Sequence, residues 1–405
     1  MSAPGAVDTS AAAPPQRVLV VASLTSSLVN FRLDLLEAMV ARGHKVLAVA
    51  PDRDPAAEAA LHAIGVGFVR IPMARASLSP AGDLRTLAAL VRLIRRWRPD
   101  VLLPYTMKPI IYGLLAGRLA GVPDRFALVT GLGYVFGEGG GSRSRALVRR
   151  LSVVLYRIAM RGVRRVFVYN EADAGDVIGS RMISDPTRLI PVPGTGVNLA
   201  RFPFRDLPPG PPVFLMIARL LREKGVTDYV EAARQLRVRR PDLRFQLLGP
   251  LDPNPTGLKR ADVDAWVEEG AIEYLGETDD VRPFLAAATV FVLPTYYREG
   301  TPRTLQEAMA MGRPVVTTDM PGCRETVEEG RNGYLVPPRD PAALAEVLWR
   351  FVEDPALAPL MGREARRAVT ERFDVRAINR LLLAQMGLDR TLTQPRMPVV
   401  QAAES

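Results

Sequence analysis

The chain has 405 residues, of which 48% are hydrophobic and 24% charged, and its formal net charge is +10. This balance is typical of soluble globular proteins, and the length predicts two or three domains that each bury a core of their own. The sequence contains no apolar stretch of roughly 18 residues or more, which argues against a membrane-spanning helix.

The two ends of the chain differ in composition from the rest. Residues 1–16 are rich in Ala, Pro, Ser and Gly, so we predict a disordered tail, and they lack the cationic start and apolar core of a secretory signal. Residues 391–405 are predicted to form a second flexible tail. The one cysteine, Cys323, excludes an intrachain disulfide and fits a reducing compartment. We expect it to pack in its loop rather than act as a nucleophile.

Strand-like and helix-like segments alternate from residue 17 onward. RVLVVAS (17–23) has the pattern of a buried strand and FRLDLLEAMVARG (31–43) that of a helix. The same step recurs as PPVFLMIAR (211–219) followed by VTDYVEAARQLRVRR (226–240). This alternation predicts an α/β fold with a parallel sheet in each half of the chain.

A run of turn-forming residues separates the two halves. Prolines and glycines are dense in residues 191–204 and again in 208–212, where no helical or strand period persists. We therefore predict a first domain over residues 17–197 and a second over 198–390. The last helix of the second domain is expected to pack back on the first.

All of the excess positive charge lies in the first half. Residues 1–205 contain 27 Lys and Arg against 14 Asp and Glu, a net +13, and residues 206–405 contain 26 against 29, a net −3. No acidic residue occurs between Gly139 and Asn170, but eight arginines do: Arg143, Arg145, Arg149, Arg150, Arg157, Arg161, Arg164 and Arg165. Apolar residues recur at helical spacing among them: Leu147, Leu151, Val154, Leu155 and Ile158.

This pattern predicts a basic amphipathic helix, which could face either of two anionic partners or simply belong to the core. An anionic membrane surface suits the segment Arg143–Arg165, since each cation near the headgroups adds about 1 kcal/mol. A core helix with a solvated arginine face is the structural alternative. Nucleic acid is not expected, because aromatic residues make up only 6% of the chain and no recognition motif is present.

Two cations follow the first strand of the second half. Arg219 ends that strand, and Lys224 stands just before Gly225 and the next helix, so both are expected at the carboxyl edge of the sheet. Arginine offers a rigid fork of donors and lysine a mobile point charge, a combination suited to a diphosphate.

Two glutamates, Glu299 and Glu307, bracket the start of a later helix. Pro302 suits the first helical position, Thr301 a cap, and Gly312 the end of the helix. The unpaired N–H groups at such a start form an anion site, here those of Thr301, Arg303 and Thr304. The spacing therefore indicates a nucleotide-sugar site. Solvated carboxylates near a positive helix end are the structural alternative.

Glu299-x7-Glu307, followed by GRPVVTTDMPGCRE and NGYLVPP, resembles the C-terminal signature of retaining glycosyltransferases with the GT-B fold, specifically glycosyltransferase family 4. The likeness extends over about residues 17–373. It implies two Rossmann-like domains that face each other across a cleft. It also implies that Glu299 contacts the transferred sugar and Glu307 the ribose hydroxyls, while Arg219 and Lys224 hold the diphosphate.

The resemblance assigns further residues to the two substrates. Catalytic roles fall on Glu299, Arg219 and Lys224. Donor-binding roles fall on Gly300, Thr301, Pro302, Arg303, Thr304, Glu307, Leu275 and Gly276, the last two through backbone contacts to the base. Acceptor-binding roles fall on Ser26, Asn30, Arg32, Lys108, Thr130 and Gly131, with Lys108 as the candidate for an acceptor phosphate. Asn30 and Arg32 could instead cap the helix that follows them.

The glycines of residues 129–141 do not match the dinucleotide pattern G-x-G-x-x-G, so we interpret this segment as a flexible loop shaping the acceptor pocket. Many family members place a histidine in this first-domain loop, where this chain has Thr130-Gly131-Leu132. Its two histidines, His44 and His62, are expected to be structural. The resemblance therefore leaves the donor sugar undefined and does not support a histidine base.

The segments YTMKP, IIYGLLAGRLAGV and TGLGYVF resemble bacterial enzymes that extend lipid-linked oligosaccharides. This implies transfer of N-acetylhexosamine or hexose from a UDP-sugar to a polyprenyl-diphosphate-linked saccharide, with retention of configuration, at the cytoplasmic face of the membrane. No cofactor or metal is implied, because two cations already neutralise the diphosphate. The D-x-D triplets at 52–54 and 262–264 are interpreted as loops or helix starts. A UDP-sugar epimerase and a non-catalytic basic membrane-binding protein remain alternatives.

Overall fold

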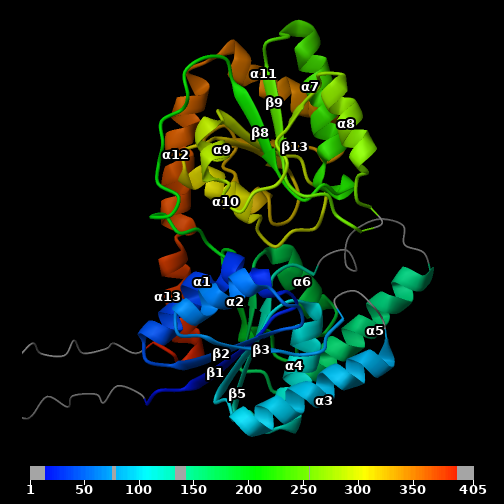
Figure 1. The fold of residues 1–405 in the computed structure, drawn as a ribbon, viewed down its shortest axis with the longest axis vertical. Helices are drawn as coiled ribbons and strands as arrows, with labels where there is room; N and C mark the ends of the chain where they lie inside the picture. The colour runs from blue at the N-terminus through cyan, green and yellow to red at the C-terminus, as the bar shows by residue number, and fades with distance from the viewer. Residues whose placement is uncertain (1–13, 75–78, 133–142, 255, 390–405) are drawn as a thin grey trace, which may run out of the picture.

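The computed structural model describes residues 14–74, 79–132, 143–254 and 256–389. It contains two α/β domains stacked along the long axis of the molecule (Figure 1). Each domain is built on a parallel sheet covered by helices, as the alternating pattern predicts. The predicted tails 1–16 and 391–405 and the glycine loop 129–141 lie wholly or partly outside the described residues.

The first domain is a seven-stranded sheet in the order β3-β2-β1-β4-β5-β6-β7. Its strands are β1 Arg17–Val21, β2 Lys45–Ala50, β3 Gly67–Arg70, β4 Val101–Pro104, β5 Asp124–Val129, β6 Arg165–Val168 and β7 Leu189–Pro191. Its helices are α1 Thr25–Ala41, α2 Pro55–Ala63, α3 Pro80–Trp97, α4 Met107–Leu119, α5 Arg143–Ala159 and α6 Glu171–Gly179.

Both faces of this sheet are covered, which explains why its strands are almost continuously apolar. Successive side chains of a strand point to opposite faces. Accordingly, Val18 and Val20 of β1 pack in the core that includes α1, whereas Leu19 and Val21 pack in the core that includes α3 and α4. Because the strands are parallel, the connecting helices run back against them. The N-termini of these helices therefore lie at the carboxyl edge of the sheet.

The second domain is a six-stranded parallel sheet in the order β10-β9-β8-β11-β12-β13. Its strands are β8 Val213–Ile217, β9 Arg244–Leu248, β10 Glu273–Tyr274, β11 Val290–Leu293, β12 Val315–Thr318 and β13 Gly333–Val336. Its helices are α7 Val226–Arg239, α8 Arg260–Glu268, α9 Arg282–Ala287, α10 Arg303–Ala310, α11 Pro341–Glu353 and α12 Leu357–Arg372.

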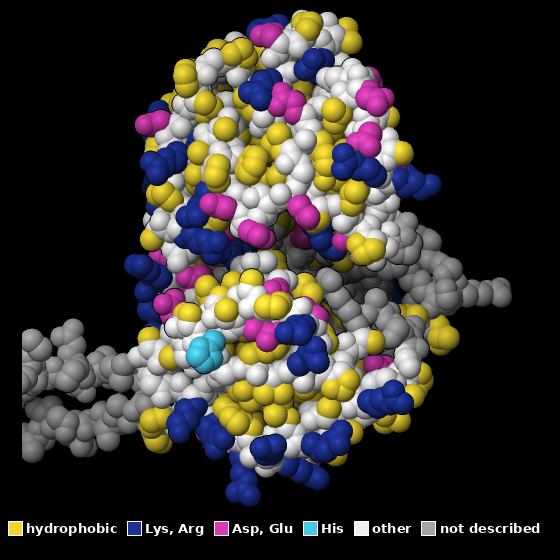
Figure 2. All heavy atoms as spheres, viewed as in Figure 1, with side chains coloured by type: hydrophobic (Ala, Val, Ile, Leu, Met, Phe, Trp, Pro, Cys, Tyr) yellow, Lys and Arg dark blue, Asp and Glu magenta, His cyan; other side chains and the backbone are white. Residues whose placement is uncertain are grey.

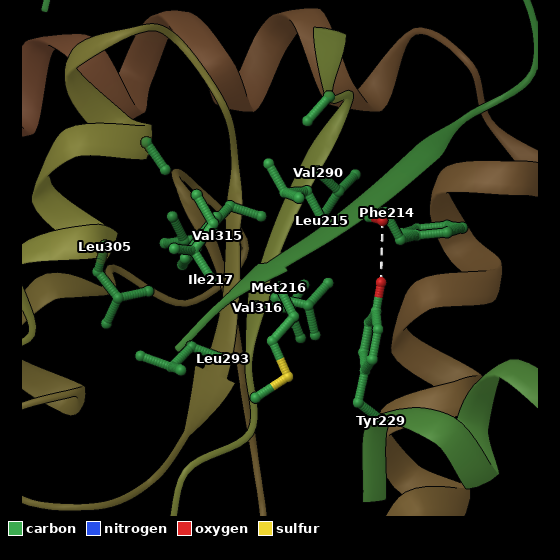
Figure 3. Packing of buried hydrophobic residues seen from close by; sticks show 14 of the residues in the cluster. Phe214, Leu215, Met216, Ile217, Tyr229, Val290, Leu293, Leu305, Val315 and Val316 are labelled. Atoms are coloured by element: carbon green, nitrogen blue, oxygen red, sulfur yellow. Dashed lines mark hydrogen bonds between the residues drawn. The ribbon is translucent and has the colours of Figure 1, made fainter. Parts of the chain in front are cut away.

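Figure 3 shows the core of the second domain, with Leu305 of α10 on one side of the sheet and Tyr229 of α7 on the other. The Tyr229 hydroxyl donates a hydrogen bond of 2.9 Å to the Phe214 carbonyl, which satisfies the one polar group of this buried ring.

Two segments connect the domains, and they run side by side. Residues 192–212 contain no regular helix or strand, in agreement with the predicted turn-rich junction. Val197 donates a backbone hydrogen bond of 2.9 Å to Phe373 and accepts one of 3.1 Å from Val375. Gly196 has φ +78°, and a Cβ there would lie 2.8 Å from the Val375 Cα, so this crossing requires glycine. After it, α13 (Val375–Met386) returns to pack on α1 in the first domain.

Helix α5 presents an apolar face to solvent. Leu147, Leu151, Val154 and Ile158 are 68%, 50%, 46% and 38% exposed, and we call these four residues the apolar stripe. The helix packs on the domain through its opposite side, where Tyr156 is buried. The structural alternative, a core helix with only its arginines in water, is therefore wrong, because the apolar stripe is also exposed to solvent. None of the described helices is long and apolar enough to cross a membrane.

Cys323 and His44 have the structural roles expected of them. Cys323 is fully buried, and burial raises the pKa of its thiol to about 12, so it is not a thiolate nucleophile at neutral pH. His44 is buried just before β2, with Nε2 2.9 Å from the Leu388 carbonyl. His62 lies in the last turn of α2, in the helix expected to hold it.

Candidate active site

A cavity of about 550 Å³ lies between the two domains. The first domain contributes the opening turns of α1 and α2, which places the carboxyl edge of its sheet at the cleft. Figure 2 shows the hollow between the two lobes, with charged side chains along its rim. The lining residues include Ser26, Asn30, Phe31, Asp54, Arg201, Asp279, Arg303, Thr304 and Glu307.

Lys224 and Glu299 meet as an ion pair in the second domain. Lys224 ends the short 3-10 helix Arg222–Lys224, and its ammonium also lies 5.4 Å from the centre of the Tyr297 ring. Both charged side chains are mostly buried, 13% and 14% exposed. Low solvent exposure strengthens their interaction and holds the carboxylate in one position. The structure thus brings together two of the three predicted catalytic residues.

Arg219 has a different partner. Its guanidinium lies 2.6 Å from Asp252 and is 43% exposed, and no described contact joins it to Lys224 or Glu299. It does follow β8 at the carboxyl edge of the sheet, as predicted. The structure therefore places Arg219 at the expected edge, with its charge directed to a neighbouring loop.

Helix α10 begins one residue later than predicted. Pro302 occupies the N-cap position with extended backbone (φ −61°, ψ 123°), and Arg303 is the first helical residue. The predicted Thr301 cap is wrong, because its buried hydroxyl makes no hydrogen bond with any described residue. The helix ends at Ala310, with Met311 as its C-cap. The first N–H groups of α10 still lack intrahelical acceptors, which preserves the basis of the anion site.

Glu307 lies in the second turn of α10, on the wall of the interdomain cavity. It is only 8% exposed, and the Arg303 Nε donates a hydrogen bond of 2.8 Å to its carboxylate. Burial raises the pKa of Glu307, and the Arg303 charge opposes that rise. Arg303, Thr304 and Glu307 all line the cavity, whereas Gly300, Thr301 and Pro302 are buried beneath it.

Leu275 and Gly276, the predicted base contacts, follow β10. The Leu275 N–H donates to the Leu247 carbonyl at 2.8 Å, and the Gly276 carbonyl accepts from the Gly249 N–H at 2.7 Å. Recognition of a base through this backbone would therefore use the Leu275 carbonyl and the Gly276 N–H.

The predicted acceptor residues are divided between the cleft and the interior. Ser26 and Asn30 line the interdomain cavity. Arg32 does not: it is 4% exposed, and its guanidinium lies 5.0 Å from the Tyr105 ring centre and 5.7 Å from that of Tyr169. The prediction that Arg32 contacts the acceptor is therefore wrong for this arrangement, because two aromatic rings hold it inside the domain.

Thr130 and Gly131 lie directly against the loop that carries Glu299. A Cβ on Gly131 would lie 2.9 Å from the Gly300 nitrogen, and one on Gly300 would lie 2.4 Å from the Thr130 carbonyl oxygen. The two backbones can approach this closely only because both positions are glycine. Gly133 and the rest of the predicted loop lie outside the described residues.

Lys108 is not in the interdomain cavity. It lies in the first turn of α4 and forms an ion pair of 2.8 Å with Asp83 of α3. Both side chains line a separate pocket within the first domain. An acceptor phosphate that binds Lys108 would therefore have to compete with the Asp83 carboxylate for the ammonium group.

Sequence reasoning missed the contacts that join the domains beside Glu299. The Asn170 side chain donates to the Glu299 carbonyl at 3.2 Å and to the Gly300 carbonyl at 3.1 Å. Arg298 forms ion pairs with Asp173 at 3.1 Å and with Asp176 at 2.5 Å. These partners are more than a hundred residues apart in the chain, and no local pattern signals their pairing.

We expect the ion pairs of Arg298 with Asp173 and Asp176 to stabilise the contact between the two domains. Asp173 is fully buried, so Arg298→Ala leaves its charge without a counterion and should lower the free energy of unfolding by about 3 kcal/mol. Arg324→Ala is the control, because it removes an exposed pair with Asp319 that contributes little. Denaturant unfolding measures both variants. Equal losses would show that Arg298 is no more important than a surface arginine.

The D-x-D triplets have structural roles. Asp54 caps α2 by accepting a hydrogen bond of 3.0 Å from the Ala57 N–H, and Asp262 accepts one of 3.1 Å from the Lys259 N–H at the start of α8. Asp264 pairs with Arg260 on the same helix. The interpretation of these aspartates as helix starts is confirmed. Among the described residues no group of three or more His, Cys, Asp or Glu is placed to hold a metal ion.

Comparison with known proteins identifies both halves of the chain. Residues 29–195 match the Glycosyl transferase 4-like domain, and residues 211–354 match the Glycosyl transferases group 1 family. A curated relative from Campylobacter jejuni, N,N'-diacetylbacillosaminyl-diphospho-undecaprenol alpha-1,3-N-acetylgalactosaminyltransferase, is 27% identical over 84% of this chain and 90% of its own length.

Solved structures share the arrangement of the two domains. Sucrose-phosphate synthase from Thermosynechococcus elongatus superimposes with a TM-score of 0.75 at 21% identity, over 92% of this chain and 98% of the other. Anabaena HepE in complex with UDP-glucose gives a TM-score of 0.73 at 19% identity, over 92% and 99%. The chain is therefore a glycosyltransferase of the GT-B fold, a member of the group 1 and family 4-like glycosyltransferases, as the Glu299-x7-Glu307 signature indicates.

Proposed function

We propose that this enzyme transfers a hexose or N-acetylhexosamine from a UDP-sugar to a polyprenyl-diphosphate-linked saccharide, with retention of anomeric configuration. One observation carries the donor half of the proposal. The Lys224–Glu299 ion pair and the buried Glu307 flank the start of α10, where backbone donors can receive a diphosphate. The UDP-glucose complex of the similar HepE fold supports a uridine nucleotide.

The proposed reaction breaks the bond between the anomeric carbon and the diphosphate oxygen. Negative charge develops on the departing phosphate, where Lys224 and the N–H groups of α10 are placed to stabilise it. Arg219 would contribute only by exchanging its ion pair with Asp252 for the phosphate. The acceptor hydroxyl attacks from the same face that the diphosphate leaves, and its proton passes to the departing phosphate oxygen. One bond between the anomeric carbon and an oxygen forms as another breaks, and one proton moves. The atoms and electrons of this step therefore balance without a metal or a cofactor.

The acceptor half of the proposal rests on two observations. The Campylobacter relative is named for an undecaprenol-linked acceptor, and it aligns over most of both chains. In this protein the apolar stripe of α5 lies in solvent, where it can enter the edge of a bilayer. The exposed Arg150 and Arg161 are on the same segment, so their charge can meet anionic headgroups. We propose peripheral attachment at the cytoplasmic face of the membrane.

The stripe yields a direct prediction about membrane binding. Leu147→Asp should lower partition onto vesicles of anionic phospholipid by about tenfold or more, because a buried leucine side chain is worth about 1.5–3 kcal/mol. Leu360→Asp on α12 is the matched control, since Leu360 is also exposed, at 54%, but belongs to the other domain. Vesicle co-sedimentation at fixed ionic strength measures both. Equal binding of the two variants would refute attachment through α5.

The activity itself is tested by UDP release from a panel of UDP-sugars, with and without polyprenyl-diphosphate-linked saccharides in detergent. Release from one donor that depends on the lipid-linked acceptor, and that Glu307→Ala abolishes, is the expected result. Absence of release from every UDP-sugar would reject the proposed donor class and lead to GDP- or ADP-sugars with soluble acceptors. Interconversion of a UDP-sugar without release would show an epimerase instead.

A further inference from the structure

A second cavity, of about 300 Å³, lies within the first domain between helices α3, α4 and α5. We call it the α3–α5 pocket. Its walls are mainly apolar: Leu84, Leu87, Met107, Ile111, Leu151 and Leu155. A volume near the lower end of the range for ligand pockets suits part of a hydrocarbon chain rather than a whole large ligand.

The position of this pocket relates it to the catalytic cleft. Its residues on α3 and α4 belong to the first two turns of those helices, at the carboxyl edge of the sheet. The first turns of α1 and α2, at the same edge, line the interdomain cavity. The α3–α5 pocket therefore opens at the level of the cleft but on the opposite face of the sheet.

Three polar side chains of the pocket, Asp83, Lys108 and Tyr112, are gathered in one cluster and are already paired, and the fourth, Ser152, donates to the Met107 sulfur at 3.9 Å. Asp83 accepts from Lys108 at 2.8 Å and from the Tyr112 hydroxyl. Burial, together with this carboxylate, raises the pKa of Tyr112. The remaining walls offer almost no donor or acceptor, so they favour hydrocarbon over water or a polar ligand.

The pocket is also continuous with the apolar stripe. Leu151 belongs to both, and Leu84 at the rim of the pocket is 66% exposed. A chain that leaves the pocket past these two residues stays in contact with apolar surface along α5. That surface is the one proposed to enter the bilayer.

We infer that the α3–α5 pocket holds the first isoprene units of the acceptor's polyprenyl chain. The saccharide of the acceptor would then reach the cleft around the carboxyl edge, and the rest of the lipid would follow the stripe into the membrane. This inference rests on the proposed function, because only a lipid-linked acceptor needs its sugar in the cleft and its chain in the bilayer at once.

Binding of farnesyl diphosphate, measured by titration calorimetry, tests the pocket without any transfer reaction. We expect it to bind at least tenfold more tightly than inorganic diphosphate and than dodecyl phosphate, which has a straight chain. Leu84→Asp, which puts a charge at the exposed rim without disturbing the core, should weaken binding about tenfold. Leu360→Asp, the same change at an exposed leucine of the second domain, should not.

A second variant fills the pocket instead of charging its rim. Leu155→Trp should also weaken farnesyl diphosphate binding about tenfold, and Val238→Trp, at an exposed position of α7, is its control. Farnesyl diphosphate that binds no better than inorganic diphosphate, or equally well to Leu84→Asp and the wild type, would overturn the inference. Equal binding of dodecyl phosphate would also overturn it by identifying a site for acyl chains.

The transfer assay separates this inference from the proposed function. Transfer that depends on a lipid-linked acceptor, with an acceptor KM unchanged in Leu84→Asp, would reject the pocket and keep the function. Tight, Leu84-dependent binding of farnesyl diphosphate by a protein that transfers no sugar to any lipid-linked saccharide would keep the isoprenoid site and reject the function.

Discussion

Lys224→Ala is expected to lower kcat for sugar transfer by about 10²–10³-fold, the usual cost of removing one preorganised group that stabilises developing negative charge. Two effects combine in this variant. The departing diphosphate loses a cation, and Glu299 loses the ammonium that holds its carboxylate in place. UDP release with saturating donor and acceptor measures kcat directly.

The same short helix supplies the control for Lys224. Arg222→Ala removes an equal charge only two residues away, but Arg222 is exposed, whereas Lys224 is mostly buried. Its kcat should stay within about twofold of the wild type. A comparable loss in both variants would mean that the general charge of this segment matters, and not the ion pair with Glu299.

Glu307→Gln is expected to raise the donor KM by about ten- to hundredfold, with a smaller change in kcat. A buried carboxylate that accepts hydrogen bonds from ribose hydroxyls contributes about 1.5–3 kcal/mol to binding, and an amide accepts more weakly. Glu371→Gln is the matched control, because Glu371 also pairs with an arginine four residues earlier, at an exposed site. An unchanged donor KM in Glu307→Gln would exclude the ribose contact.

The pKa of Glu307 adds a pH dependence to this prediction. Burial raises that pKa, so the carboxylate becomes protonated at a higher pH than an exposed glutamate does as the solution is acidified. The value of kcat/KM for the donor should therefore fall with decreasing pH through this raised pKa, and the fall should disappear in Glu307→Gln.

The raised pKa of Glu307 affects stability and donor binding in opposite directions: as pH rises, donor binding improves but the free energy of unfolding falls. Between the unfolded and the folded pKa the native state binds the proton more readily, so the free energy of unfolding decreases as pH rises through this window. Glu307→Gln removes the free-energy cost of burying a charged carboxylate. We therefore expect this variant to unfold no more easily than the wild type at neutral pH. Thermal unfolding across the pH range checks this expectation independently of activity.

Local patterns in the sequence were sufficient for the fold class and for the second-domain part of the site. The strand–helix alternation predicts both parallel sheets, because period and burial are properties of short segments. The sequence places Lys224 and Glu299 at the same edge of one sheet, but their ion pair is a finding of the structure. The start of α10 was predicted less accurately, because Pro302 is the N-cap and Thr301 makes no capping hydrogen bond.

Arg32 and Lys108 show what local patterns do not determine. Lys108 follows a strand at the carboxyl edge, as expected. Arg32, expected at the very start of a helix over 31–43, lies inside the longer helix α1, Thr25–Ala41. Only the packed structure shows that Arg32 lies over two tyrosine rings and that Lys108 pairs with Asp83 in a different pocket. Side-chain direction depends on neighbours from other elements, and those neighbours are distant in the chain.

The sequence by itself therefore determined the two α/β units, the turn-rich junction, the glycosyltransferase signature and the amphipathic character of α5. Tertiary structure alone decided that the stripe of α5 faces solvent, that Arg298 and Asn170 join the domains beside Glu299, and that an apolar pocket lies between α3, α4 and α5. The reason is physical: periodicity and turn chemistry act within about ten residues, whereas burial and ion pairing depend on which surfaces meet after the chain has folded.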